Sequence, residues 1–228
     1  DLDSLGPKQE GFLRVYNLSQ NGKSLNVINS ETILEVELET PLFPNETTEF
    51  SMDFVGQVPD LVRRAGKNSR DGIEYSMAQW YPKMCEYDLE GWNADPYTGR
   101  EFHGVWGNFD VKIKIDKEYV VAASGYLQNA DNIGMGYSKR KKPKSKKGKV
   151  EWHFVAPNVH DFTWSADKNY LHDTYPGPNE VTLHFFYKND PKIINNWKKL
   201  QPYTAKMMEY FNSKVGLYPY KQYTVAQG

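Results

Sequence analysis

The chain has 228 residues, with 28 Lys and Arg against 29 Asp and Glu, and a formal net charge of −1. This length is enough for one large β-domain or two ordinary domains. The balanced charge excludes a strongly basic nucleic-acid-binding protein, so we expect no nucleic-acid partner. No apolar run approaches the roughly 20 residues of a membrane span, and the single cysteine, Cys85, has no partner for an internal disulfide.

Apolar and polar residues alternate in many short segments of the first 188 residues, which is the pattern of half-buried strands. The clearest case is residues 109–115, where Phe109, Val111, Ile113 and Ile115 alternate with polar and charged side chains. Further strands are predicted at residues 33–38, 50–54, 119–123, 150–155, 162–165 and 181–187. Turns rich in Gly, Pro and Asn separate them, so the sequence predicts a mainly β fold, an antiparallel β-sandwich or saddle-like domain.

A basic run interrupts this pattern at residues 139–149, where eight of eleven residues are Lys or Arg. Such a run is typical either of a nucleic-acid or heparin patch or of a solvated hairpin tip. Because the run contains no aromatic residues, we favour the solvated tip and leave the role of the run open.

A helix is predicted to begin after Asp190, a good N-cap, with Pro191 at its first position. Apolar residues recur along one predicted helical face, at Ile193, Ile194, Trp197, Leu200, Met207, Met208, Tyr210 and Phe211. Gly216 and Pro219 end the helix, and residues 222–226 have strand character. We expect a domain boundary here, with a β-domain over residues 1–189 and a short α/β segment over 190–228. Because the strand is followed by only two residues, we expect the chain to be a fragment.

Candidate catalytic groups are few. None of the five histidines, at positions 103, 153, 160, 172 and 184, has a helical partner one turn away, as a zinc-binding helix requires. Asp88 and Glu90 share one side of a loop and suit a calcium or sugar contact, although solvation is the default expectation. The sequence therefore predicts no complete catalytic constellation and no metal bound by this chain.

Four motifs, in order, resemble the aminopeptidase N family of zinc metallopeptidases. The first is residues 76–88, with Gln79 on a predicted strand, and the second is the strand at 109–115 followed by residues 120–125. The third is residues 156–164, which end in Asp161, Phe162, Thr163 and Trp164. The fourth is residues 208–220, which are similar to the first helix of the family's thermolysin-like catalytic domain. The resemblance implies the β-domain and the start of the catalytic domain of an enzyme that hydrolyses amino-terminal peptide bonds.

The resemblance also implies roles for three residues. Gln79 matches a glutamine that lines the substrate pocket, where its amide would bond the peptide backbone. Tyr81 stands where many members carry Glu or Gln, so this strand lacks the acid that holds a substrate's amino group. Gly228 matches the start of a glycine-rich substrate-binding loop. The zinc ligands, the general base and the transition-state Tyr would lie in the remainder of the catalytic domain, so zinc and a peptide substrate are expected in the parent enzyme.

Two alternatives stay open. A non-catalytic carbohydrate- or protein-binding β-sandwich would use exposed aromatic residues such as Trp92 and Trp106, whereas Trp152 and Phe154 alternate as core residues. A family member that has lost its zinc chemistry would act as a scaffold. For the parent protein we expect a secreted or periplasmic location.

Overall fold

The computed structural model describes residues 6–60, 65–94, 104–143 and 148–228. The chain divides into two compact units. Unit 1 comprises Asp1–Pro59 and Gln79–Trp106, and unit 2 comprises Asp60–Ala78 and Gly107–Gly228. In the described ranges, no helix combines the length and the apolar character that a membrane crossing needs.

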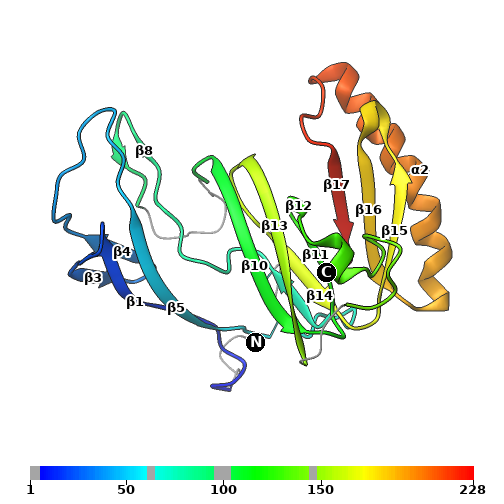
Figure 1. Ribbon diagram of the computed structural model, residues 1–228, viewed down its shortest axis with the longest axis horizontal. Helices are drawn as coiled ribbons and strands as arrows, with labels where there is room; N and C mark the ends of the chain where they lie inside the picture. The colour runs from blue at the N-terminus through cyan, green and yellow to red at the C-terminus, as the bar shows by residue number, and fades with distance from the viewer. Residues whose placement is uncertain (1–5, 61–64, 95–103, 144–147) are drawn as a thin grey trace. The chain divides into compact units, whose positions relative to one another are not determined.

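Unit 1 consists of short antiparallel strands (Figure 1). Its sheet has the order β2-β1-β5, and two hairpins, β3–β4 and β8–β9, complete the unit. The bounds are β1 Phe12–Gln20, β2 Lys23–Ser24, β3 Val27–Ser30, β4 Ile33–Val36, β5 Phe50–Gln57, β8 Tyr87–Asp88 and β9 Gly91–Trp92. The predicted strand at 33–38 is thus two residues shorter, and Met52 and Phe54 of β5 are each 38% exposed rather than buried on one face.

Two antiparallel sheets of unit 2 contribute part of its buried core. Their orders are β10-β13-β12 and β11-β14-β7-β6. The bounds are β6 Gly66–Lys67, β7 Tyr75–Met77, β10 Gly107–Asp116, β11 Val120–Ala123, β12 Tyr126–Leu127, β13 Lys149–Val159 and β14 Trp164–Asp167, with a short helix α1 at Ala130–Ile133. Trp152 and Phe154 on β13 are fully buried, and β10 alternates between exposed and partly or fully buried positions, which confirms both predictions.

The third sheet of unit 2 has the order β15-β16-β17, and helix α2 lies on one of its faces (Figure 1). The bounds are β15 Tyr170–Pro176, the 3-10 helix η2 Pro178–Glu180, β16 Thr182–Lys188, α2 Pro191–Lys214 and β17 Gln222–Ala226. The Asp190 side chain accepts a hydrogen bond from the backbone N–H of Lys192, which confirms the predicted N-cap. Because β17 runs parallel to β16, the two strands and α2 form a β-α-β unit.

The buried face of α2 differs from the predicted one. The residues of α2 that pack on the sheet recur with helical spacing, at Ile194, Trp197, Gln201, Thr204 and Met208. Leu200, Met207, Tyr210 and Phe211 were predicted on the same face but are exposed, since their spacing places them on a second apolar stripe. On the buried face, the Trp197 ring stacks on Tyr187 of β16, with ring centroids 5.1 Å apart.

These sheets establish the predicted mainly β, antiparallel fold class. The domain boundary between residues 189 and 190 stays a prediction. It falls between β16 and α2, which pack against each other in unit 2.

Candidate functional site

Gln79 lies just beyond strand β7 and not on a strand, which corrects the prediction. The ladder of β7 ends where Met77 pairs with Trp164. Gln79 has a left-handed backbone, with φ of 54°, and this conformation cannot continue a strand. The side chain is exposed, so its amide is presented to solvent.

Tyr81 belongs to an aromatic group in unit 1. Its ring meets Trp80 edge to face, with centroids 5.2 Å apart, and the Lys83 ammonium lies 5.5 Å from the Tyr81 centroid. Trp80 also contacts Phe54 of β5, with centroids 6.3 Å apart. Tyr81 is half-buried and offers a phenol and an aromatic face, and not a carboxylate, to any ligand.

Gly228 follows a firmly held strand end in unit 2. The backbone N–H of Gln227 donates to Phe186 O over 2.8 Å, and the Gln227 side chain accepts from the backbone N–H of Lys188 over 3.0 Å. The Tyr170 hydroxyl donates to the Gln227 carbonyl. A Cβ added at Gly228 would lie 3.3 Å from Ser76 Oγ of β7. The structure thus brings Gly228 beside Ser76 of β7, which is three residues before Gln79 in the sequence.

His172 and His184 form a hydrogen-bonded pair on neighbouring strands β15 and β16. His172 Nε2 lies 2.8 Å from His184 Nδ1, and His172 Nδ1 lies 3.1 Å from the Met135 carbonyl. A carbonyl only accepts, so His172 carries its proton on Nδ1, and His184 Nδ1–H donates to His172 Nε2. The pKa of both imidazoles is lowered to about 4, mainly by burial, and for His172 the neighbouring His184 contributes to this shift.

This pair predicts a loss of stability in acid. In the unfolded chain the two histidines bind protons below about pH 6.5, whereas in the folded chain they stay neutral down to about pH 4. The free energy of unfolding should therefore fall as the pH drops through this window, by about 1.4 kcal/mol per pH unit for each histidine. Urea unfolding between about pH 7 and pH 4 measures this slope. His184→Gln should make the slope shallower, and an unchanged slope would contradict the assignment.

The described residues do not fit a zinc site. Within those ranges, no three His, Cys, Asp or Glu side chains lie close enough together to hold a metal ion. His172 uses both ring nitrogens in hydrogen bonds, and His153 Nε2 is 2.8 Å from Asp110 Oδ1. His103 falls outside the described residues.

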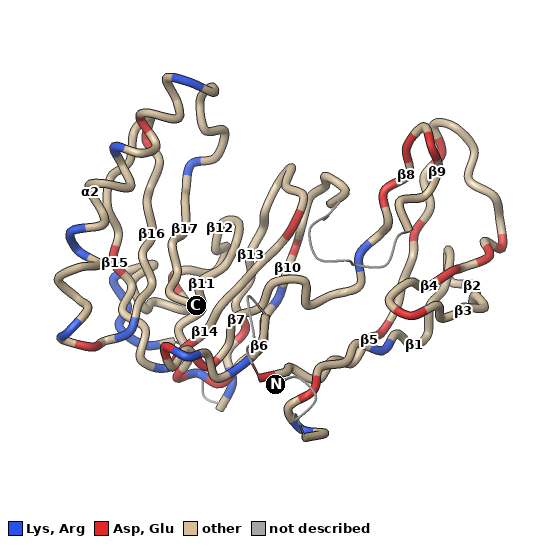
Figure 2. Tube along the Cα trace, turned by 180° about the vertical axis from the view of Figure 1, so that it is seen from behind, with Lys and Arg blue, Asp and Glu red and all other residues tan. Residues whose placement is uncertain are grey.

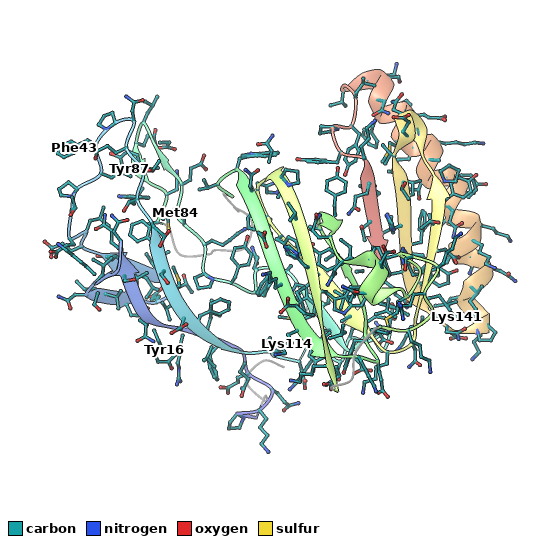
Figure 3. All side chains as sticks on the ribbon, in the orientation of Figure 1. Tyr16, Phe43, Met84, Tyr87, Lys114 and Lys141 are labelled. Atoms are coloured by element: carbon teal, nitrogen blue, oxygen red, sulfur yellow. The ribbon has the colours of Figure 1, made fainter. Side chains whose placement is uncertain are left out.

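The carboxylate of Asp88 holds a hairpin turn. It accepts from the backbone N–H of Glu90 over 2.8 Å and from the Asn93 amide over 3.0 Å. Beside it, Tyr87 (labelled in Figure 3) and Trp92 meet edge to face, with centroids 4.9 Å apart, and both rings are exposed. The hairpin therefore exposes an aromatic pair, and both Asp88 oxygens already accept hydrogen bonds within the turn.

The basic run contributes to a pocket that sequence reasoning missed. Residues 144–147 lie outside the described residues, but Lys141 and Lys142 line a pocket of about 540 Å³ in unit 2. Lys117 and Lys168, from two other turns, line the same pocket. No spacing rule relates lysines in three separate turns, so the only sequence signal was the basic run itself.

Comparison with solved structures defines the class of fold. The chain has the fold of part of the M1 zinc metallopeptidases, with low sequence identity. A Deinococcus radiodurans M1 zinc metallopeptidase has a TM-score of 0.59 at 19% identity, over 94% of this chain and 46% of that protein. A variant of a two-domain M1 zinc metallopeptidase bound to L-arginine gives 0.57 at 18%, over 94% and 46%. Aminopeptidase A from Legionella pneumophila, in complex with aspartic acid, gives 0.56 at 13%, over 99% and 25%.

The chain thus spans less than half of the length of each of these proteins. No protein-family model and no curated protein sequence matches the chain.

Proposed function

We propose that this chain forms the amino-terminal β-domain and the first part of the catalytic domain of an aminopeptidase N-like zinc metallopeptidase. The observation that carries the proposal is the likeness of fold to M1 zinc metallopeptidases over 94% of the chain. The order of the sequence motifs supports it independently. The parent enzyme would hydrolyse amino-terminal peptide bonds, and a secreted or periplasmic location is part of the same proposal.

The second apolar stripe of α2 supports the remainder of a catalytic domain as the partner of this chain. The side chains of this stripe are between 40% and 68% exposed. The stripe consists of Leu200, Tyr203, Met207, Tyr210 and Phe211. They recur with helical spacing on a helix that already packs its other face on β16. A helix with apolar residues on two faces is typical of a helix buried on both sides. The proposed division into residues 1–189 and 190–228 assigns this helix to the catalytic domain.

Within this proposal, the β-domain forms a wall of the substrate cleft and Gln79 orients the peptide. Its exposed amide offers both a donor and an acceptor to a peptide backbone. Gly228 would begin a loop that approaches the substrate through its backbone, since glycine leaves room for such an approach. Tyr81 would supply an aromatic face, so the group that binds the substrate's free amine would come from elsewhere.

Zinc would be bound by residues of the remaining catalytic domain, because the described side chains of this chain do not fit the ion. The contribution of the chain is therefore to bind and orient substrate.

The role of Gln79 can be tested in the protein that carries the remainder of the catalytic domain. Gln79→Gly deletes the amide and suits the left-handed backbone, whereas Gln79→Asn keeps an amide and also tolerates that backbone. We expect Gln79→Gly to raise KM for an unblocked tripeptide about five- to tenfold, the value of one hydrogen bond. Gln79→Asn should retain part of the affinity. Steady-state kinetics, with the N-acetylated tripeptide as the uncleaved control, measures both effects.

Three results would contradict the proposal. One is equal KM values for Gln79→Gly and for Asn195→Ala, an exposed control on α2 that lies away from both apolar stripes. Another is cleavage of the acetylated tripeptide as fast as of the free one. The third is the absence of hydrolysis together with saturable quenching of tryptophan fluorescence by oligosaccharides. That last result would support the binding-module alternative through the exposed Tyr87–Trp92 pair.

A further inference from the structure

The pocket of about 540 Å³ in unit 2 gathers positive charge from three turns that are far apart in the sequence. Lys117 and Glu118 lie between β10 and β11, Lys141 and Lys142 between α1 and β13, and Lys168 between β14 and β15. Figure 2 shows basic segments close to β14 and β15, and Lys141 is labelled in Figure 3. The fold, and not a single basic run, therefore creates this concentration of ammonium groups.

The charge of the pocket is not balanced within the described part of the chain. Four lysines and one glutamate line it. None of the four lysines forms an ion pair with a described carboxylate, and the Lys168 ammonium lies over the Tyr119 ring, 5.1 Å from its centroid. Four lysines and one glutamate around the same pocket give it an excess of positive charge, which attracts an anion.

Part of the pocket lining is well fixed. Val120 and Tyr170 belong to a buried apolar cluster, and the Tyr170 hydroxyl is held by the Gln227 carbonyl and by Ser165. Gly136 lines the pocket with φ of 89°, and a Cβ there would lie 2.5 Å from His172 Nδ1. A well-packed lining suits a ligand pocket, and the volume is in the range of small-molecule sites.

We propose that this pocket binds a small anion that carries two or more phosphate groups. Lysine binds phosphate as a point charge, and lysines from three turns can reach separate phosphates of one ligand. The described lining has no arginine, whose planar fork would favour a single carboxylate or phosphate. The lysines come from three turns around one pocket, which suits a compact ligand that can contact all of them. This inference is independent of the proposed peptidase function.

Inorganic tripolyphosphate is the probe for this site. Isothermal titration of the 228-residue chain should give saturable binding that weakens as salt is added. The double substitution Lys141→Gln with Lys142→Gln should weaken binding roughly 25-fold, at about fivefold for each ammonium removed. Lys198→Gln with Lys199→Gln removes the same charge from exposed positions on α2 and should leave binding unchanged. Thermal unfolding of each variant without ligand confirms that it is folded.

Substituting Glu118 tests the proposal in the opposite direction, because it should strengthen binding. Glu118→Gln removes the carboxylate that repels the ligand, and we expect binding to tighten about fivefold. Absence of saturable binding, or an equal loss in the two double variants, would overturn the proposal. So would binding of heparin or an RNA oligonucleotide with which tripolyphosphate does not compete, because the basic segment would then serve a polymer.

Discussion

Lys188→Met is expected to destabilise unit 2 by about 3–5 kcal/mol, because it leaves a buried carboxylate without its counter-charge. The Lys188 ammonium lies 2.9 Å from Asp167 Oδ2, and the Asp167 side chain is completely buried. Asp167 also accepts backbone N–H groups from Glu74, over 3.1 Å, and from Asn169, over 2.7 Å. These hydrogen bonds position the carboxylate but leave its charge in place. Urea unfolding followed by tryptophan fluorescence measures the loss.

A surface ion pair provides the control for this substitution. Lys221 and Glu180 are 3.2 Å apart with side chains 63% and 89% exposed, so Lys221→Met should cost less than about 1 kcal/mol. Adding Asp167→Asn to Lys188→Met removes the buried charge and should restore part of the stability. If the double variant is less stable than Lys188→Met alone, the buried charge is not the cause.

Gly125→Ala is expected to cost about 2–6 kcal/mol, as the sum of backbone strain and a steric clash. Gly125 has φ of 76°, and an added Cβ would lie 2.6 Å from the Val155 carbonyl oxygen and 2.7 Å from Ala156 Cβ. Both atoms belong to β13, whose long pairing with β10 restricts any shift. The midpoint of thermal or urea unfolding measures the effect.

Gly72 separates the two contributions in the same unit. Its φ of 82° is similar, but the nearest atom to an added Cβ is the Lys188 Cε at 3.7 Å. Gly72→Ala should therefore show the strain alone, about 1 kcal/mol. Equal losses for the two alanine variants would show that β13 yields to the added methyl group.

Most of the fold prediction rested on the spacing of apolar residues and on residue types that are typical of helix ends. The period-2 pattern of residues 109–115 marks β10 because one face of that strand packs on the core while the other meets solvent. Asp190 and Pro191 mark the start of α2. The Asp190 side chain accepts a hydrogen bond from a backbone N–H of the first turn, and proline at the first helical position has no N–H that needs a partner. Such local signals do not depend on the rest of the molecule.

The orientation of α2 could not be predicted in the same way. Two apolar stripes compete on this helix, and the buried one includes the polar residues Gln201 and Thr204. Gln201 donates to Asp173 over 3.2 Å, and the Thr204 hydroxyl donates to the Leu200 carbonyl over 3.1 Å. Tertiary hydrogen bonds thus make polar residues suitable for burial, and a hydropathy pattern does not contain that information.

The candidate site depended even more on tertiary structure. Gln79 was identified through a resemblance, but its left-handed backbone beyond β7 follows from the point at which pairing with β14 stops. Gly228 lies beside Ser76, which is far from it in the sequence, so only the tertiary structure brings the two residues together. The lysine pocket joins three turns, so only the fold brings Lys117, Lys141 and Lys168 together.

The parallel pairing of β16 with β17 has a consequence for synthesis on the ribosome. Thr182 pairs with Gln222, so 222 − 182 = 40 residues separate these partners in the chain. During translation, β16 emerges well before β17 and presents an unpaired edge until the later strand arrives. This edge is expected to stay unprotected for longer than the edge that β16 pairs with β15, and chaperones that shield exposed strands would act on it during that interval.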